Sequence, residues 1–353
     1  LPIEVLEDSE TRKVEAHRKP LGVIGAIVPW NFPMILMAFK VPPALIAGNT
    51  VVLKPSPTTP LTSLRLGELI KDIVPAGVLN IVTDANDLGA PLTAHPDVNK
   101  ISFTGSTATG AKVMAGAAGL IKRITLELGG NDAAIVLDDV EPKKVAQQLF
   151  DSAFQNSGQV CIAMKRLYVH DSIYDEVVDE LAAIANKTVI GDGLEQGTKL
   201  GPLQNKMQYE KVKELIESAR RDGNIVAGGE VPDQSGYFIR PTIVRDVTEG
   251  SRIVDEEQFG PVLPVIRFSD ESDAIARANN SNYGLGGSVW SSDLERAYDV
   301  ANQMNTGTVW INKHAELDPG IPFGGSKQSG LGNELGMEGL KEFTQLKMIN
   351  MAR

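Results

Sequence analysis

Apolar runs of strand length alternate with segments of helical periodicity along most of the chain, and this alternation limits the possible folds more than any other feature. From Gly22 onward the runs read "GVIGAIV", "TVVLK", "VLNIV", "KISFT" and "RITLEL". Such alternation is typical of parallel sheets covered by helices. After "ELGG" at residues 127–130 a second series begins with "AAIVLD". The pattern predicts an α/β fold with two lobes, and 353 residues suffice for about two domains.

Both ends of the chain carry strand patterns outside this alternation. The first 19 residues form two partly alternating runs around a "DSE" turn, and two strands alone are only marginally stable. We therefore expect this hairpin to lean on another surface. The closing segment "EFTQLKMINM" is predicted to extend the edge of a sheet.

One helix in the first lobe has clear boundary signals. Thr59 is placed to cap it and Pro60 occupies the first helical turn. Four apolar side chains then share roughly one side, namely Leu61, Leu64, Leu69 and Ile73.

Composition excludes several classes of protein. The 34 basic residues are outnumbered by 45 acidic ones, and a net charge of −11 without a basic patch argues against binding to nucleic acid or anionic lipid. The apolar runs are shorter than the roughly 20 residues that a membrane span needs, and no leader opens the chain. One cysteine and four dispersed histidines rule out a disulfide framework and a zinc pattern. We expect a cytoplasmic protein without a metal site.

The single cysteine has two possible roles. Cys161 lies in "NSGQVCIAMKR", where Gly158 allows close backbone approach, and the preceding helical pattern predicts a loop or turn that presents the sulfur. A thiol whose pKa is lowered there is a strong nucleophile. A free cysteine is also among the residues most often buried as packing, so this window leaves both interpretations open.

Two polar residues follow strands of the first series. Glu127 ends a strand just before paired glycines, where burial would raise its pKa and suit it to general-base work; a solvated strand-end charge is the alternative. Asn31 in "PWNFP" carries an amide that could donate to an oxyanion, although Asn and Pro are also ordinary turn residues.

Two further motifs are compatible with a nucleotide. "FTGSTATG", residues 103–110, predicts a strand, a glycine turn and a helix start that could cradle phosphate, but it lacks the GxGxxG spacing and its residues also serve as caps. Lys54 in "VVLKPS" could donate to ribose hydroxyls, or could simply be solvated.

Together these segments resemble the aldehyde dehydrogenase superfamily. The likeness runs from about Pro20 to the C-terminal tail and rests on "PWNFP", "LKPS", "FTGST", "LELGG", "GQVC", "EEQFGPV" and "PFGGSKQSGLG" in the family's order. Each motif is modest, but seven at compatible separations favour the functional interpretation of each.

The resemblance implies a role for each matching residue. Cys161 would be the nucleophile, Glu127 the base, and Asn31 an oxyanion donor beside the Cys161 backbone N–H. A thiohemiacetal would lose hydride to nicotinamide and leave a thioester, which water hydrolyses to the acid. The implied cofactor-binding residues are Trp30, Lys54, Pro57, Gly105, Ser106, Glu257 and Phe259. Glu257 would hold the nicotinamide ribose.

Three departures from the family pattern affect these expectations. Pro57 stands where many NAD-preferring members carry glutamate, and since it neither grips the ribose nor repels a 2′-phosphate, NAD and NADP both stay open. Asn333 replaces a frequent arginine, without an evident consequence. The family usually carries a helical segment before the hairpin; its true absence would uncover part of the cofactor domain and put activity in doubt.

The resemblance also predicts the substrate and the domains. Leu36, Phe39 and Ile162 are placed along the aldehyde tunnel and suggest an apolar aliphatic or aromatic aldehyde. Residues 1–19 would form an oligomerisation arm, 20–128 a Rossmann-like dinucleotide-binding domain, 129–330 a catalytic domain, and 331–353 a segment returning to the first domain and the arm. Exposed strand edges there favour a homodimer or homotetramer.

Two other functions stay open at this stage. A relative that acylates CoA would transfer the acyl group to CoA rather than to water, but a positioned Glu127 favours hydrolysis. A non-catalytic or truncated relative would retain the fold alone, and the presence of Cys161, Glu127, Asn31 and Glu257 together argues against it.

Overall fold

The computed structural model describes residues 1–353, and the chain divides into two compact units. Unit 1 comprises residues 1–128, 317–324 and 330–353, and unit 2 comprises residues 129–316 and 325–329. The sequence placed residues 317–324 with the second lobe. They group with unit 1 because backbone hydrogen bonds tie them to it, from Phe323 N to Glu334 O and back, and from Gly336 N to Pro319 O.

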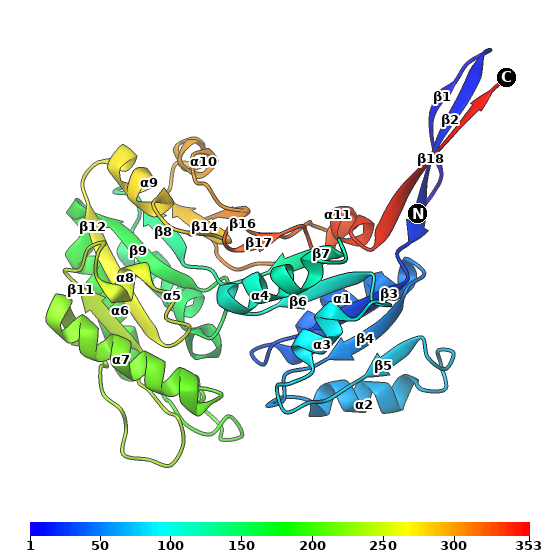
Figure 1. The fold of residues 1–353 in the computed structure, drawn as a ribbon. Coiled ribbons are helices and arrows are strands. Elements are labelled where there is room, and N and C mark those ends of the chain that lie inside the picture. Colours follow the sequence, from blue (N-terminus) through cyan, green and yellow to red (C-terminus); the bar gives the residue numbers. More distant parts are fainter. The chain divides into compact units, whose positions relative to one another are not determined.

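A six-stranded sheet forms the centre of unit 1, in the order β17-β7-β6-β3-β4-β5 (Figure 1). Its parallel strands coincide with the predicted apolar runs and are β3 (Val23–Ile27), β4 (Thr50–Lys54), β5 (Leu79–Ile81), β6 (Lys100–Thr104) and β7 (Arg123–Glu127). The short β17 (Gly330–Leu331) pairs antiparallel with β7. Because Thr104 pairs with Glu127 and Ile27 with Lys54, the carboxyl ends of β4, β6 and β7 lie along one edge.

Five helices accompany this sheet: α1 (Pro33–Ile46), α2 (Leu61–Ile70), α3 (Gly89–Ala94), α4 (Thr107–Ala118) and α11 (Gly336–Lys341). One buried cluster joins α1 to β3 and β4, and includes Leu36, Val41 and Leu53. A second cluster joins α4 to β6 and β7 through Val113, Phe103 and Leu126. Two apolar layers therefore fix the sheet between its helices, as the α/β pattern predicts.

The prediction for α2 was wrong in detail. The helix begins at Leu61, Pro60 takes the cap position, and no side chain caps it. The hydroxyl of Thr59 makes no hydrogen bond. Ile73 lies beyond the end of the helix, and all four predicted apolar residues are exposed: Leu61 77%, Leu64 40%, Leu69 59% and Ile73 77%. Ser63 and Leu66 are the residues that turn inward, so apolar spacing alone did not identify the buried face.

The opening hairpin and the closing strand form a separate three-stranded sheet. It is made of β1 (Glu4–Asp8), β2 (Arg12–Pro20) and β18 (Thr344–Ala352), with β2 in the centre. β18 pairs antiparallel with all of β2, from Thr344 opposite Pro20 to Ala352 opposite Arg12. The prediction that the hairpin leans on another element is confirmed, and the closing segment extends its edge. We call this sheet the arm; it projects from the rest of unit 1 (Figure 1).

Unit 2 contains a seven-stranded sheet in the order β10-β11-β12-β9-β8-β14-β15. The strands are β8 (Asp132–Val136), β9 (Met164–His170), β10 (Asn224–Ala227), β11 (Thr242–Arg245), β12 (Val262–Phe268), β14 (Gly286–Trp290) and β15 (Thr308–Ile311). All neighbours are parallel except β10 and β11. A two-stranded sheet pairs β13 (Tyr283–Gly284) with β16 (Ser326–Lys327).

Helices cover this second sheet. They are α5 (Pro142–Phe154), α6 (Tyr174–Lys187), α7 (Lys206–Asp222), α8 (Arg252–Asp255), α9 (Glu271–Asn279) and α10 (Leu294–Asn302), with 3-10 turns η1 (Gln155–Gly158) and η2 (Asp171–Ile173). One cluster joins the sheet to α7, α9 and α10, and another joins it to α5 and α6. The second lobe is thus α/β, as predicted.

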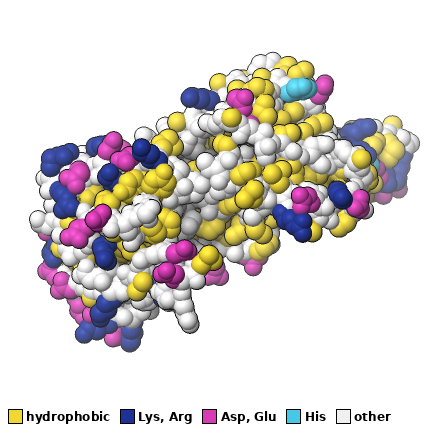
Figure 2. Space-filling view, turned by 90° about the horizontal axis from the view of Figure 1, so that it is seen from below, with side chains coloured by type: hydrophobic (Ala, Val, Ile, Leu, Met, Phe, Trp, Pro, Cys, Tyr) yellow, Lys and Arg dark blue, Asp and Glu magenta, His cyan; other side chains and the backbone are white.

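None of the eleven α-helices combines the length and apolar character that crossing a membrane requires. On the face shown in Figure 2, Lys and Arg side chains are mixed with Asp and Glu, and apolar side chains reach the surface between them. No basic patch dominates that face.

Candidate active site

Glu127 is a buried carboxyl group at the end of β7 in unit 1. The residue is 4% exposed, and its Oε1 has no hydrogen-bond partner. Burial, together with the nearby charge of Glu334, raises the pKa of Glu127 well above its usual value, although Lys40 opposes this. A carboxylate that holds its proton more tightly is a stronger base. The structure therefore gives Glu127 the environment that the sequence predicted for it.

Lys40 and Glu334 form a buried ion pair that the sequence analysis missed. Both side chains are essentially inaccessible, and Lys40 Nζ also donates to Ser102 Oγ at 3.2 Å. A signal was available in α1, where Leu36, Met37, Val41 and Ala44 are buried and Lys40 falls on the same stripe. The pair sets the charge around Glu127.

Lys54, at the end of β4, forms an ion pair within unit 1. Its Nζ donates to Asp84 Oδ1 at 3.0 Å, and the Asp84 side chain is fully buried. Burial alone would raise the pKa of Asp84, but the hydrogen bonds from Lys54 and from the Leu88 N–H outweigh it and lower that pKa. An ammonium group fixed by a carboxylate at a strand end still has donors for a further hydroxyl. Pro57 lies exposed in the turn that follows.

The "FTGSTATG" segment forms the end of β6 and the start of α4. Ser106 is the N-cap of α4, its Oγ accepting from Thr109 N at 3.3 Å, so the capping alternative holds for its side chain. Gly105 N donates to Glu127 O at 3.0 Å. Thr104 Oγ1 is buried without a hydrogen-bond partner at the same edge. An exposed N-terminus of a twelve-residue helix beside an unused hydroxyl fits an anionic group such as a pyrophosphate.

Trp30 and Asn31 are half-buried in the loop between β3 and α1. Of the predicted tunnel residues on α1, Leu36 is buried in the core of unit 1 and Phe39 packs against that core. The exposed apolar side chains of α1 are Met34 and Ile35. Leu36 thus faces the interior of unit 1, and its tunnel role stays a prediction.

Cys161 lies in unit 2 in a turn between η1 and β9, and it is partly exposed. The three residues Asn156, Ser157 and Gly158 all have left-handed φ angles of 50°, 54° and 74°. These angles break the chain away from α5 and return it toward β9. The structure confirms the prediction that a turn, rather than a strand, presents the sulfur.

Gly158 cannot be replaced by a larger residue in this turn. A Cβ there would lie 2.2 Å from the carbonyl oxygen of Gly260, and its φ is in the left-handed region. The predicted close backbone approach is thereby confirmed, and the contacted strand end belongs to the "EEQFGPV" motif. Two motifs of unit 2 therefore meet at Gly158.

Glu257 of the same motif is half-buried and faces the start of unit 2. Its Oε1 accepts from Gly130 N at 3.0 Å and lies 3.7 Å from Lys165 Nζ. A Cβ on Gly129 would lie 2.6 Å from Glu257 Oε2, so glycine is needed there. Phe259 is half-buried with a left-handed φ of 51°. Cys161, Glu257 and Phe259 are thus all carried by loops of unit 2.

Ile162 is buried beside Cys161, and its carbonyl oxygen lies 2.9 Å from His314 Nε2. His314 and the buried Asp132 were not singled out from the sequence. Asp132 begins β8, and a carboxylate at the head of the fully buried run "DAAIV" was the available signal. Burial raises the pKa of Asp132 to about 7, although Lys165 opposes the effect.

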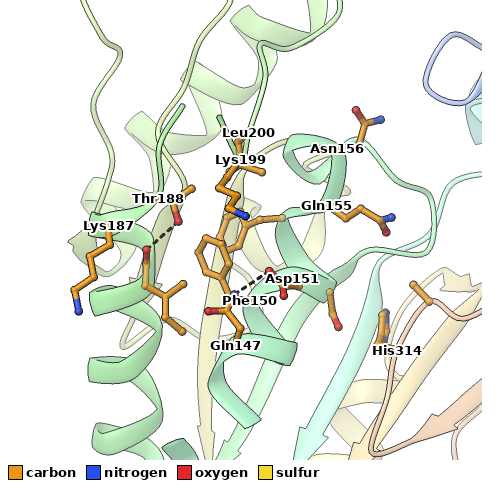
Figure 3. A pocket seen from close by; sticks show the side chains of 14 residues that line it. Gln147, Phe150, Asp151, Gln155, Asn156, Lys187, Thr188, Lys199, Leu200 and His314 are labelled. Carbon is orange, nitrogen blue, oxygen red and sulfur yellow. Dashed lines mark hydrogen bonds between the residues drawn. The ribbon is translucent and has the colours of Figure 1, made fainter. Parts of the chain in front are cut away.

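A groove of about 1000 Å³ lies on unit 2 next to this turn (Figure 3). α5 supplies Phe150 and Asp151, and the segment before Cys161 supplies Gln155 and Asn156. His314 lines the groove from the other side. The groove therefore borders the segment that precedes the cysteine turn.

Residues 2–349 match the aldehyde dehydrogenase family model. This chain belongs to the aldehyde dehydrogenase family. It is 43% identical to a phenylacetaldehyde dehydrogenase of Pseudomonas fluorescens over all of this chain and 70% of that protein. It is 45% identical to a chloroplastic betaine aldehyde dehydrogenase of Beta vulgaris, over 96% of this chain and 69% of that protein.

Solved structures of aldehyde dehydrogenases superpose closely on this one. The NAD⁺ complex of the Bacillus cereus enzyme is 40% identical, with a TM-score of 0.97 over 100% of this chain and 72% of that one. An NADP-dependent Escherichia coli enzyme is also 40% identical, with a TM-score of 0.96 over 100% of this chain and 74% of that one. The dehydrogenase described here is an enzyme that oxidises aldehydes to acids with NAD or NADP, as the resemblance predicted.

Proposed function

We propose that Cys161 is the nucleophile of this aldehyde dehydrogenase. The observation that carries the proposal is the position of the only cysteine, in a partly exposed turn after three left-handed residues. In the first step the thiolate sulfur bonds to the aldehyde carbon, and the carbonyl oxygen becomes an oxyanion. The Asn31 amide and the Cys161 backbone N–H donate hydrogen bonds to that oxyanion.

Loss of a hydride from the carbon of this adduct leaves a thioester, and the hydride acceptor would be supplied by NAD or NADP when bound. Lys54, Gly105, Ser106 and Glu257 are the residues that would hold the cofactor, with Trp30, Pro57 and Phe259 beside it. The exposed N-terminus of α4, the unused Thr104 hydroxyl and the strand-end Lys54 support this assignment. All three lie at the carboxyl edge of the sheet in unit 1, where such sheets place ligands.

Glu127 completes the cycle as general base. Its carboxylate takes a proton from water, the water oxygen adds to the thioester carbon, and the carbon–sulfur bond breaks to release the acid and the thiolate. The buried position of Glu127 and its raised pKa support this role. Hydrolysis by a positioned base also favours water over CoA as the acyl acceptor.

The substrate is proposed to be an apolar aldehyde, recognised in part by Phe39 and Ile162. Phe39 is half-buried, and Ile162 is buried and follows Cys161 directly in the chain. A tunnel lined by such apolar side chains would bind aldehydes more tightly as the apolar area of the aldehyde grows. The phenylacetaldehyde dehydrogenase of Pseudomonas fluorescens is a relative whose name fits this class, whereas the name of the betaine aldehyde dehydrogenase does not. A kcat/KM series over aliphatic, aromatic and quaternary-ammonium aldehydes decides the point, and a flat aliphatic series would refute the proposal.

The arm is proposed to join subunits into a homodimer or homotetramer. The outer edge of β18 is unpaired within the chain, and the arm exposes Val5, Leu6, Leu346, Met348 and Met351. Such an edge is a template for another strand.

We also propose that the protein is cytoplasmic, because a reactive thiol requires reducing surroundings.

The test of the nucleophile is the variant Cys161→Ser. We expect the rate of cofactor reduction by aldehyde to fall by roughly 10³-fold or more, with unchanged cofactor affinity. The assay monitors the absorbance of the reduced cofactor with NAD and with NADP, and product analysis with and without CoA identifies the acyl acceptor. Retained oxidation in the variant would show that another group attacks the aldehyde.

A further inference from the structure

A chain of hydrogen bonds in unit 2 leads from β14 to the residue after the nucleophile. Trp290 Nε1 donates to Ser288 Oγ at 2.9 Å, and Ser288 Oγ lies 2.9 Å from His314 Nδ1. The other ring nitrogen, His314 Nε2, lies 2.9 Å from the carbonyl oxygen of Ile162. A carbonyl oxygen only accepts, so Nε2 carries the proton and Nδ1 accepts from the Ser288 hydroxyl.

The ring of His314 is held in one state. Its side chain is fully buried, and burial lowers the pKa of His314 to about 3, although the bond to Ile162 opposes the shift. The ring is therefore neutral across the working pH range, and its proton stays on Nε2. A neutral ring with both nitrogens bonded has a fixed orientation.

Asp132 lies against the same ring. Its Oδ2 is 3.8 Å from His314 Nε2 and has no hydrogen-bond partner, while its Oδ1 accepts from Gly286 N at 3.1 Å. Two glycines make room for this carboxyl group. A Cβ on Gly286 would lie 2.5 Å from Oδ2, and one on Gly130 would lie 2.9 Å from Oδ1.

Other charged groups face Asp132 from β9 and from the loop before β12. Lys165 and Arg166 favour its ionised form, and Glu257 disfavours it. Arg166 is already bonded to the carbonyl oxygens of Asn131 and Ala278 and to the Tyr168 hydroxyl. Lys165 Nζ donates to Cys161 O at 2.5 Å. Asp132 therefore has one unused oxygen in a site with net positive surroundings.

The backbone of the cysteine turn is consequently held from several directions. Lys165 binds the carbonyl of Cys161, and His314 binds the carbonyl of Ile162. The Cys161 carbonyl also packs against Gly130, where a Cβ would lie 2.6 Å away. Two consecutive carbonyls fixed in this way set the direction of the peptide groups around the sulfur.

We propose that His314 is a positioning residue for Cys161, acting through the Ile162 carbonyl, and that the buried Asp132 beside its ring makes this positioning depend on protonation. When Asp132 is ionised, its free oxygen attracts the Nε2 proton and weakens the hold on Ile162. When Asp132 is protonated, the hold is at its strongest. The inference rests on the proposed role of Cys161 as nucleophile.

The first experiment compares His314→Phe with His314→Gln in the 353-residue chain. The Gln amide nitrogen is the same number of bonds from the backbone as Nε2 and retains the donor, whereas Phe removes it. We expect single-turnover cofactor reduction by aldehyde to fall roughly 10- to 100-fold in the Phe variant, at unchanged cofactor affinity, and to recover in the Gln variant. His95→Phe, in unit 1, is the matched control.

The second experiment measures the rate at which iodoacetamide alkylates Cys161 as a function of pH. A buried negative charge near a thiol disfavours the thiolate, so Asp132→Asn should shift the midpoint to lower pH and remove one of two ionisations from the profile. Alkylation needs no aldehyde turnover. If the Cys161→Ser variant kept its activity, the assignment of Cys161 as nucleophile would fail. The alkylation rates of the wild type and of Asp132→Asn would still report how Asp132 affects the cysteine turn.

The outcomes separate positioning from simple packing. Equal impairment in His314→Phe and His314→Gln would mean that the shape of the ring matters rather than its donor, and wild-type rates in His314→Phe would overturn the proposal outright. An unchanged alkylation profile in Asp132→Asn would remove Asp132 from it. Should His314→Phe fail to fold, His314→Asn, whose amide cannot reach Ile162, takes its place.

Discussion

Single residues in unit 1 determine when the proposed base can act. Glu127 is buried near a second carboxylate, Glu334, and both effects hold its proton on the carboxyl group to higher pH than in water. Since only the ionised form removes a proton from water, hydrolysis of the thioester should accelerate as pH rises through this raised pKa. In the proposed mechanism, formation of the thioester depends less on Glu127 than its hydrolysis does.

The variant Glu127→Gln should separate these two steps. Without the base, thioester hydrolysis should slow by roughly 10²- to 10⁴-fold, whereas hydride transfer should change little. A stopped-flow trace of cofactor reduction is expected to show a rapid burst of about one equivalent followed by a slow steady state. A trace without a burst, at an unchanged steady rate, would contradict the role of Glu127.

Replacing Glu334 should move the pH dependence of the same step. Glu334→Gln removes a negative charge near Glu127, and the cation of Lys40 stays in place. The pKa of Glu127 should therefore fall. We expect the rate of hydrolysis to rise at lower pH than in the wild type, measured from single-turnover rates. Glu338→Gln, on the exposed side of α11, is the control. Identical profiles would show that Glu334 has no influence on the base.

Ionisation of Asp132 should lower the stability of the protein as pH rises. Its pKa is raised to about 7 by burial, so its contribution to the free energy of unfolding is present in acid and is lost as pH rises toward 7. The Asp132→Asn variant has no carboxyl group to ionise, so it does not undergo this loss. Its free energy of unfolding should therefore increase relative to that of the wild type as pH rises from about 4 to 7. Thermal unfolding at several pH values measures the difference, and a difference constant with pH would refute the raised pKa.

At the scale of elements, the turn η1 places Cys161, the proposed nucleophile, through backbone geometry. Gly158 combines a left-handed φ of 74° with a contact to Gly260 that leaves no room for a Cβ. The same turn is anchored by Ser157 Oγ, which donates to Gly201 O at 2.7 Å. A substitution at Gly158 should therefore disturb both folding and the position of Cys161.

Gly158→Ala should lower the free energy of unfolding by about 1–3 kcal/mol and slow alkylation of Cys161. The matched control is Gly193→Ala in the same unit, because a Cβ at Gly193 would have no atom within 4 Å. Thermal unfolding and thiol titration check the two effects. Equal behaviour of the two variants would show that the turn tolerates a side chain.

The elements that could be predicted depend on neighbouring residues in the sequence, whereas those that were missed depend on distant ones. Strands such as β8 were predictable because "AAIV" is buried throughout and reads as one continuous apolar run. The turn of Cys161 was predictable because a glycine precedes it. The Lys40–Glu334 pair was not, because its members are 294 residues apart and only the folded chain brings them together. The inward face of α2 was also missed, since local spacing does not say which side meets the sheet.

At the scale of the whole molecule, the arm has a nine-residue strand, β18, whose outer edge is unpaired. β2 is paired on both sides, but β18 offers a full strand edge to another chain. The arm also exposes apolar side chains on β1 and β18. These features make association the expected state.

Deleting residues 344–353 should abolish that association. Light scattering with size exclusion is expected to show a larger species for the full chain at micromolar concentration and a monomer for the truncated one. Circular dichroism checks that the α/β units remain folded. A monodisperse monomer for the full chain would contradict the proposed homo-oligomer.

The pairing of β18 with β2 also has a consequence for biosynthesis. Arg353 N bonds to Thr11 O at 2.9 Å, so β18 closes onto a hairpin that precedes both α/β units in the chain. On the ribosome the hairpin β1–β2 must wait, unprotected, until β18 has been synthesised. A polypeptide released before residue 344 would display two unsatisfied strands, a state that chaperones and proteases can distinguish from one with a complete arm.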